Sequence, residues 1–285
     1  MTVRVAGRPL WLLVLAAIGA SLLLVVALAR WGAPSDEHAY WLAARRLIDD
    51  VPLYDPSATI VTPFAYLYPP PLAQALVPIA AVVPAWLFSL GWTVLMGASL
   101  FWLAGKDVLR TLALIAFPPV AVEFWFRNVH LFLAVLVVLG LRRTASAFSV
   151  GAAIKVSPVL GIPYVALRGR WRDAGIACLV GIVMLLASIA LSPDAWRAYI
   201  DFALSVDPLQ QSSFVAVPLP VRGIVGVVLA LVAARFPRSI GDPLLVVAVT
   251  VALPSLWFTG LSLLVAIVPL VRSDMQERAD RLPEI

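Results

Sequence analysis

The amino-acid sequence predicts an all-α polytopic membrane protein that forms a single integral membrane domain over residues 1–285. Hydrophobic residues make up 62% of the chain and charged residues only 13%, whereas about a quarter of the residues of a soluble domain are charged. Apolar runs long enough for helices recur along the chain, and Lys and Arg residues stand in small groups between them. Such groups are typical of topology signals, so we expect membrane lipids, and no nucleic acid, among the partners.

The first apolar run, residues 10–29, follows Arg4 and Arg8. About twenty apolar residues suffice to cross a hydrocarbon core of roughly 30 Å as a helix. The run is longer than the apolar core of a cleaved signal peptide, which has about 7–15 residues. We therefore expect residues 1–30 to form a retained signal-anchor helix.

Residues 31–83 interrupt the apolar pattern with a polar and acidic stretch. Ser35 and Asp36 precede an amphipathic segment, which is typical of a helix start and of a helix that lies along a membrane surface. Residues 71–83 are short and bracketed by prolines, which predicts a half-helix at the outer interface. The whole stretch is therefore expected to be a loop with juxtamembrane helices.

Two groups of apolar segments follow. The core group, residues 84–191, has segments at 84–105, 109–122, 128–141, 146–156, 158–168 and 173–191. The C-terminal group, residues 219–285, has segments at 219–234, 242–256 and 259–271, and residues 192–218 are predicted to form an outer loop between the groups. The short segments that meet at Lys155 and Pro158 indicate a broken pair. With the first run, these segments predict about ten transmembrane helices.

The positions of the basic residues predict the orientation. Lys and Arg collect in the cytoplasmic loops of membrane proteins. A cytoplasmic N-terminus gathers five basic groups on one side: Lys106 and Arg110; Arg142 and Arg143; Arg168, Arg170 and Arg172; Arg235 and Arg238; and Arg272, Arg278 and Arg281. The acidic loop, residues 123–130 and Lys155 then face the outside. Ionisable residues at membrane depth are costly and often functional, so we expect the site on the extracytoplasmic face of a multi-pass protein of the plasma membrane.

Several short motifs occur in order along the chain. They are Asp36 followed by Tyr40 and Ala43-Ala44-Arg45, Leu53-Tyr54-Asp55-Pro56, Tyr68-Pro69-Pro70-Pro71-Leu72, Glu123 before FWFRNVHLFL, and AAIKVSPVLGIPYVALRGRW at 152–171. In this order and spacing the chain resembles glycosyltransferase family 87, the polyprenyl-phosphate-mannose-dependent α-mannosyltransferases of the GT-C superfamily. The resemblance implies a GT-C-type bundle with outer-face juxtamembrane helices. It also implies an inverting transfer of a hexose, mannose in the family, from a polyprenyl phosphate donor to an extracytoplasmic lipid or glycan acceptor, without a cofactor.

The resemblance assigns the catalytic aspartate to Asp36, which implies that residues 31–83 are the extracytoplasmic catalytic loop. The chemistry agrees, because a sugar hydroxyl is a poor nucleophile and needs a carboxylate within hydrogen-bond distance to take its proton. Two alternatives stay open. Asp36 caps the helix that follows, or Glu37 replaces it as the base.

The leaving polyprenyl phosphate needs cations or helix N-termini to stabilise its charge. Lys155, Arg127 and Arg222 are the candidates, because each stands at the predicted outer end of an apolar segment. The alternative for each is a side chain that simply extends to the membrane surface. Glu123 stands one helical turn before Arg127, which predicts an ion pair between the two.

Further substrate-binding candidates are polar or aromatic residues of the predicted outer face: Glu37, Tyr40, Tyr68, His130, Asn128 and Gln211. The chain has only two histidines and one cysteine, so we predict neither a metal site nor a disulfide. Where the family usually has Gly-Gln-Val-Asn, this chain has Arg127-Asn128-Val129-His130. This departure bears on the recognition of the acceptor and of the donor sugar.

Two other function classes stay open. A transporter or flippase of a polyprenyl-linked sugar would use the same cations without a base, and a non-catalytic GT-C-like membrane partner would keep only the fold. Asp36 distinguishes these classes from the enzyme, since only the enzyme needs its carboxylate.

Overall fold

The computed structural model describes residues 4–5, 8–9, 19, 35–55, 64–205 and 217–271. These residues lie in helices and their connections, apart from the strands β1 (Arg4–Val5) and β2 (Arg8–Pro9), which pair antiparallel. The predicted signal-anchor run at 10–29 falls outside the described residues, except for residue 19.

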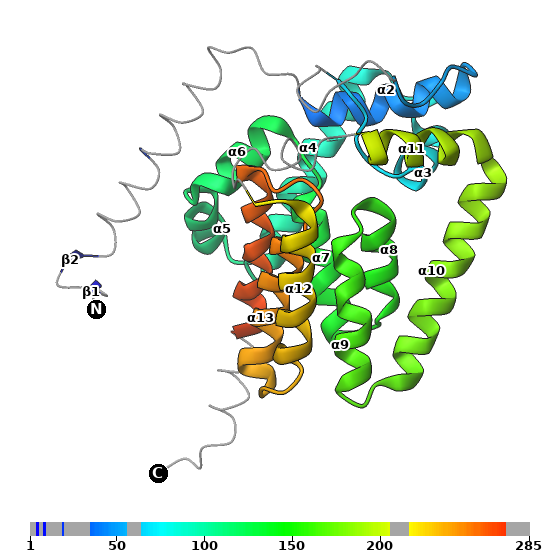
Figure 1. Cartoon of the computed structure of the whole chain (residues 1–285). Helices are drawn as coiled ribbons and strands as arrows, with labels where there is room; N and C mark the ends of the chain where they lie inside the picture. Colours follow the sequence, from blue (N-terminus) through cyan, green and yellow to red (C-terminus); the bar gives the residue numbers. More distant parts are fainter. Residues whose placement is uncertain are drawn as a thin grey trace, which may run out of the picture.

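One end of the molecule, called here the α2 end, carries three helices that lie across the others (Figure 1). They are α2 (Asp36–Ile48), α3 (Pro70–Ala80) and α11 (Pro193–Ser205). The body of the molecule consists of α4 (Ala85–Leu103), α5 (Val108–Ile115), α6 (Pro118–Phe126), α7 (His130–Arg142), α8 (Ser146–Ile154), η1 (Ser157–Leu160), α9 (Gly161–Leu167), α10 (Trp171–Leu191), α12 (Leu219–Ala233), α13 (Arg238–Val251) and η2 (Phe258–Ala266).

Prolines set several of the helix boundaries. Pro70, Pro118 and Pro158 stand in the first turns of α3, α6 and η1. A proline is tolerated there because the first N–H groups of a helix have no partner within it, whereas a proline cannot continue a preceding helix. Pro118 thus separates α5 from α6, which meet at 83°. The run at 109–122, predicted as one crossing, is therefore a bent pair.

Two described helices, α4 and α10, are long and apolar enough to cross a membrane, and the bent pair of α5 and α6 is a third candidate. Shorter apolar helices accompany them at Pro70–Ala80, His130–Arg142, Ser157–Leu167, Leu219–Ala233 and Phe258–Val271. These apolar helices indicate a membrane protein. The bundle of about ten crossings and the single membrane domain stay predictions.

The helix break at Lys155 agrees with the prediction from the short segments around it. α8 ends at Ile154, and Lys155 has an extended backbone with φ −139° and ψ 132°. η1 then begins at Ser157 and leads directly into α9. The break leaves Lys155 between two helices rather than on the face of one.

The segment predicted as an outer loop, 192–218, contains a helix in its first half, because residues 193–205 form α11. Aromatic residues recur on this helix at helical spacing. The rings of Tyr199 and Phe202 lie 5.7 Å and 5.8 Å from the ring of Tyr54, measured between centres. This packing holds α11 against the segment that follows α2.

α7 is the central helix of the body and packs on α4, α8 and η2. Its fully buried apolar residues are Leu131, Leu133, Ala134, Val137 and Val138. A helix that is apolar on every side needs neighbours on every side. The first residue of this buried helix, His130, is at the α2 end, so the core of the body reaches the site described below.

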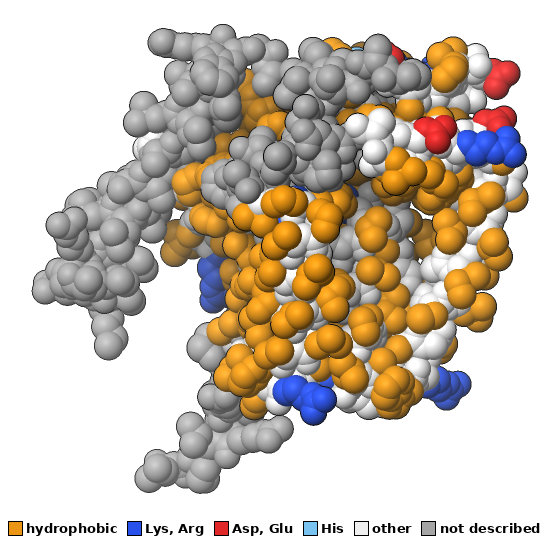
Figure 2. Space-filling model, in the orientation of Figure 1, with side chains coloured by type: hydrophobic (Ala, Val, Ile, Leu, Met, Phe, Trp, Pro, Cys, Tyr) orange, Lys and Arg blue, Asp and Glu red, His pale blue; other side chains and the backbone are white. Residues whose placement is uncertain are grey.

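The surface divides into an apolar belt and two charged ends (Figure 2). Large exposed apolar side chains of the belt include Trp86, Leu90 and Val94 on α4 and Leu179, Val183 and Leu186 on α10. In this view Lys and Arg side chains stand at the end opposite α2 and at one place halfway up the left side, while the acidic side chains lie at the α2 end, beside a basic group. A continuous apolar belt of this kind suits a lipid environment.

Candidate active site

Asp36 is the first residue of α2, and part of the residue is exposed at the α2 end. Ser35 occupies the cap position of this helix, and its side chain makes no capping hydrogen bond. The Asp36 carboxylate accepts a hydrogen bond from the side-chain amide of Asn128, a residue distant in sequence. The geometry is therefore that of a carboxylate held between two segments rather than that of a helix cap.

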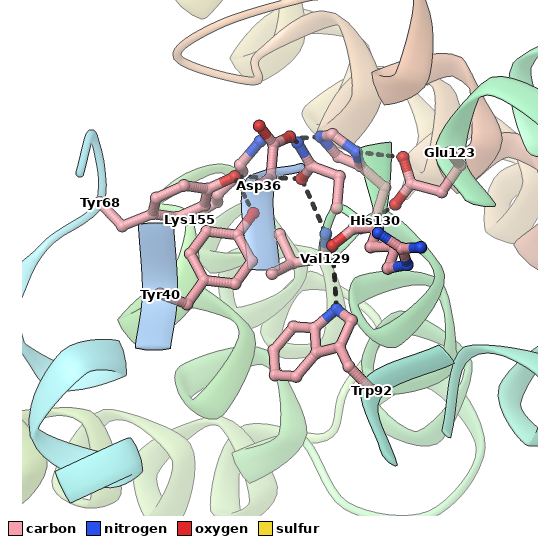
Figure 3. A network of polar contacts seen from close by, with 10 residues as sticks. Asp36, Tyr40, Tyr68, Trp92, Glu123, Val129, His130 and Lys155 are labelled. Atoms are coloured by element: carbon pink, nitrogen blue, oxygen red, sulfur yellow. Dashed lines mark hydrogen bonds and ion pairs between the residues drawn. The ribbon is translucent and has the colours of Figure 1, made fainter. Parts of the chain in front are cut away.

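One tyrosine and one backbone N–H fix the orientation of that amide; Figure 3 shows Tyr68 and Val129, with Tyr40 beside Tyr68. The Tyr68 hydroxyl donates to Asn128 Oδ1 at 3.0 Å, and the backbone N–H of Val129 donates to the same oxygen at 2.7 Å. The Tyr40 hydroxyl lies 2.8 Å from the Tyr68 hydroxyl and donates to it, because the Tyr68 proton is used on Asn128. Since the amide oxygen receives both donors, the amide nitrogen faces Asp36.

A second chain of polar groups lies behind the first. Glu123 is on α6, His130 begins α7, and Lys155 stands in the break after α8. Lys155 Nζ lies 2.8 Å from His130 Nε2, and His130 Nδ1 lies 2.9 Å from Glu123 Oε2. Lys155 Nζ also lies 5.0 Å from the centre of the Tyr68 ring, within the range of a cation–π contact. The two series of hydrogen-bonded polar groups therefore meet at Tyr68.

The ion pair predicted between Glu123 and Arg127 does not form. Arg127 ends α6 in the left-handed region, with φ 51° and ψ 47°, so its side chain leaves the helix face that carries Glu123. Its guanidinium pairs with Glu37 at 3.0 Å and donates from Nε to Thr93 Oγ1 at 3.2 Å. Glu37 is buried and also accepts from the Ser89 hydroxyl at 2.8 Å. These contacts tie α2 to α4 and to the turn between α6 and α7.

Arg222 belongs to neither of these two series of polar groups. Its buried guanidinium donates to the backbone carbonyls of Val217, Val251, Leu253 and Pro254. Carbonyls at a helix end need such partners, and three of these four belong to the end of α13 and the loop after it. Among the described residues no contact joins Arg222 to Asp36. Gln211 lies outside the described residues.

Three residues on α4 also contribute to the site: Ser89, Trp92 and Thr93. They were not predicted from the sequence. Trp92 Nε1 donates to the Arg127 carbonyl at 2.9 Å, beside the contacts that Ser89 and Thr93 make. The available signal was their spacing of three and four residues in an otherwise apolar run. Such spacing puts polar groups on one face of a helix, and these groups need partners at membrane depth.

The pKa of the Asp36 carboxyl is raised to about 7, chiefly because burial of the carboxyl disfavours the charged form, although part of the residue reaches the surface. The Lys155 ammonium opposes this shift, as does the hydrogen bond from Asn128, whereas the charges of Glu123 and Glu37 add to it. A carboxyl with this pKa is about half ionised near neutral pH, which suits a general base. Among the residues described, no group of three or more His, Cys, Asp or Glu side chains is placed to hold a metal ion.

Comparison with known proteins gives one match. The model of glycosyltransferase family 87 matches residues 66–268, which is more than half of the chain. The matched range includes Asn128, His130 and Lys155, whereas Asp36 precedes it. No curated protein and no solved structure matches the chain. The match and the ordered motifs of the sequence agree, and the chain belongs to glycosyltransferase family 87.

Proposed function

We propose that the protein is an inverting transferase that moves a hexose, with mannose as the first donor sugar to test, from a polyprenyl phosphate to a lipid or glycan acceptor outside the cytoplasm. Family membership makes the protein a glycosyltransferase with a donor and an acceptor. The observation that carries the finer proposal is the placement of the Asp36 carboxylate: Asn128 holds it, Tyr68 donates to Asn128, and the buried Lys155 ammonium lies over the Tyr68 ring.

In the proposed reaction, the ionised Asp36 takes the proton of the acceptor hydroxyl while the hydroxyl oxygen attacks the anomeric carbon. The bond from that carbon to the phosphate oxygen breaks, and its electron pair leaves with the polyprenyl phosphate. Attack opposite the leaving group inverts the anomeric carbon, so a β-linked donor gives an α-linked product. Lys155 stabilises the negative charge of the leaving phosphate.

Lys155 fits this role better than the other two predicted cations. An ammonium has three N–H donors, and His130 Nε2 receives one of them. Arg127 is already paired with Glu37, so we assign it to the support of α2. The guanidinium of Arg222 is committed to backbone carbonyls, and we no longer propose it as a phosphate ligand.

The distribution of basic residues supports a site outside the cytoplasm in a multi-pass protein. The turns from α9 to α10 and from α12 to α13 lie at the end opposite α2 (Figure 1). They carry Arg168, Arg170 and Arg235. Lys and Arg mark the cytoplasmic side, so the α2 end is assigned to the extracytoplasmic face of the plasma membrane.

The test is transfer of radiolabelled mannose from synthetic polyprenyl phosphate mannose to a membrane-lipid extract. Wild type should form a labelled product, and Asp36→Asn should lower the rate by about 10²-fold or more, the usual contribution of a general base. Asp49→Asn is the matched control, because Asp49 is an exposed acid at the other end of α2. It should keep the wild-type rate.

Equal rates for wild type and Asp36→Asn would remove Asp36 from the role of base. No product from wild type, under conditions where another family member is active, would contradict mannose as the donor sugar. Movement of the intact lipid-linked sugar across a vesicle membrane, without transfer, would instead favour the flippase.

A further inference from the structure

Glu123, His130 and Lys155 form a continuous chain of buried polar groups from three separate segments. Their exposed fractions are 0%, 0% and 6%. The separations of 2.9 Å between Glu123 Oε2 and His130 Nδ1 and of 2.8 Å between His130 Nε2 and Lys155 Nζ are those of hydrogen bonds. Figure 3 shows the imidazole beside Glu123, with Lys155 on the side of Asp36 and Tyr68.

With Glu123 ionised as a carboxylate and Lys155 protonated as an ammonium, only one placement of the imidazole proton satisfies these contacts. A carboxylate only accepts hydrogen bonds, and Glu123 accepts from the backbone N–H of His130 at 2.7 Å and from Nδ1 of the same residue. The imidazole proton is therefore on Nδ1, and Nε2 offers its lone pair to the Lys155 ammonium. An imidazolium would point a second N–H at the ammonium, and two donors cannot form a hydrogen bond with each other.

The direction of the Lys155 side chain depends on this acceptor. The Lys155 ammonium lies over the Tyr68 ring. Tyr68 is hydrogen-bonded to Asn128, and Asn128 to Asp36. Within the described part of the chain, His130 Nε2 is the hydrogen-bond acceptor of Lys155 Nζ. An ammonium has two further N–H groups, which can bind a ligand.

We infer that Glu123 is a positioning residue: its carboxylate selects the tautomer of His130, and this tautomer aims the Lys155 ammonium at the donor phosphate. The inference rests on the proposed function for the identity of the phosphate. This role explains why Glu123 and Lys155 are buried near each other although no direct contact joins them. The neutral imidazole connects the two opposite charges, so the buried chain has no net charge.

Glu123→Gln tests this inference because glutamine has the same size and keeps one acceptor. Its carbonyl oxygen can still accept from the His130 backbone N–H, which preserves the start of α7. Its amide group must donate to Nδ1, which moves the imidazole proton to Nε2 and turns that atom into a donor facing Lys155. His38→Gln is the matched control, because His38 is the other histidine of the chain and packs on Phe64.

The experiment is ¹⁵N NMR of the full-length protein, labelled at histidine and held in lipid nanodiscs. The His38→Gln spectrum assigns the His130 signals by subtraction. We expect a protonated Nδ1 and an unprotonated Nε2 in wild type and in His38→Gln, and a protonated Nε2 in Glu123→Gln. An Nε2–H tautomer or an imidazolium in wild type at neutral pH would overturn the inference. This measurement uses the wild-type protein, so it does not depend on whether a variant folds. An unchanged tautomer in Glu123→Gln would overturn it as well.

Kinetics with polyprenyl phosphate mannose give a second readout. Glu123→Gln should raise the donor KM by about tenfold or more, the value of one charge-assisted hydrogen bond, and leave the acceptor KM unchanged. An unchanged donor KM, or an equal rise in both KM values, would contradict a role through Lys155. A wild type without transfer activity would contradict the proposed function and not the tautomer, which is measured without substrate.

Discussion

At Arg127 the backbone takes a conformation that a residue with a Cβ adopts only at a cost. Its φ is 51°, in the left-handed region, which costs about 1–2 kcal/mol. The turn directs Arg127 toward Glu37 while the next residue, Asn128, faces Asp36. Two consecutive residues thus hold the first turn of α2, and the ion pair with the buried Glu37 offsets the strain.

Arg127→Ala should lower the free energy of unfolding by about 2 kcal/mol, because Glu37 is only 2% exposed and would lose its cation. Adding Glu37→Gln should recover much of this loss, since no buried charge is then left unpaired. Thermal unfolding in detergent measures both changes. Arg197→Ala is the control, because its ion pair with Asp194 is exposed and contributes little. A double variant as unstable as Arg127→Ala would contradict this account.

The raised pKa of Asp36 predicts how activity depends on pH. A general base acts only when deprotonated, so kcat/KM should fall with decreasing pH below about 7, by about tenfold per pH unit. Asn128→Ala should move this fall in kcat/KM to higher pH, because the amide of Asn128 stabilises the ionised Asp36 carboxylate. Initial rates measured from about pH 5 to about pH 9 test both statements. A profile that stays flat across the acid range would assign the base to another group.

The contacts of this site follow only in part from the sequence. Helical spacing pairs Glu123 with Arg127, yet Arg127 pairs with Glu37 because a left-handed turn ends α6 between them. Spacing rules hold within one helix, whereas this site is built across the joints of several helices. The sequence indicates that Asn128 belongs to the site, but its contact with Asp36 depends on how distant segments pack.

Among the helices, α7, α8 and α9 meet at one aromatic ring. Gly140 on α7 and Gly161 on α9 both face the buried Phe148 on α8. A Cβ atom at Gly140 would lie 2.6 Å from the ring, and one at Gly161 would lie 2.2 Å from it. Glycine is required at both positions because the ring fills the space of a side chain. This contact holds the two helices that flank Lys155 against α7.

Gly161→Ala should therefore destabilise the protein by about 1–3 kcal/mol, because the added methyl group would overlap the Phe148 ring. Gly175→Ala on α10 is the matched control, since a Cβ there meets nothing within 4 Å. Alanine in an open helical position stabilises by up to about 1 kcal/mol. The melting temperatures of the two variants should move in opposite directions. A Gly161→Ala protein as stable as wild type would show that Phe148 moves aside without cost.

The helices themselves differ in how well the sequence predicts them. Apolar length predicts α4, α7, α10 and α12 at nearly their observed positions, because local composition decides them. The bend between α5 and α6 is missed by apolar length, although Pro118 and Pro119 mark it. α11 is missed because its polar residues resemble a loop, and its apolar side finds its partner in Tyr54, which is distant in sequence.

Across the molecule as a whole, charge is divided between two ends that the apolar belt separates (Figure 2). The basic residues opposite α2 also satisfy helix ends: Arg170 donates to the Leu141 carbonyl at 2.7 Å, and Arg168 donates to the Phe236 carbonyl at 2.6 Å. Cations are favourable at the carbonyl ends of helices. The same side chains therefore stabilise the fold and, in our proposal, mark the cytoplasmic side.

Labelling of single cysteines tests this orientation. The native Cys178, which is exposed on α10, is first replaced by alanine. Val51→Cys, at an exposed position after α2, should react with an impermeant thiol reagent on intact cells. Arg235→Cys, at an exposed position after α12, should react only once the membrane is permeabilised. The reverse pattern would place Asp36 in the cytoplasm and contradict the proposed orientation.

The first five residues of α2 contact the body of the molecule through Asp36, Glu37 and Tyr40, whose ring packs on Trp92 of α4. Each residue of an α-helix advances the rotation about its axis by about 100°, so all three contacts exist together at a single angular phase of α2. Deleting one residue inside this stretch would put the carboxylate, the ion pair and the tyrosine out of phase at once, whereas a residue added before Ser35 would leave the phase unchanged. The three contacts of α2 are therefore kept or lost together, according to the rotational register of this one helix.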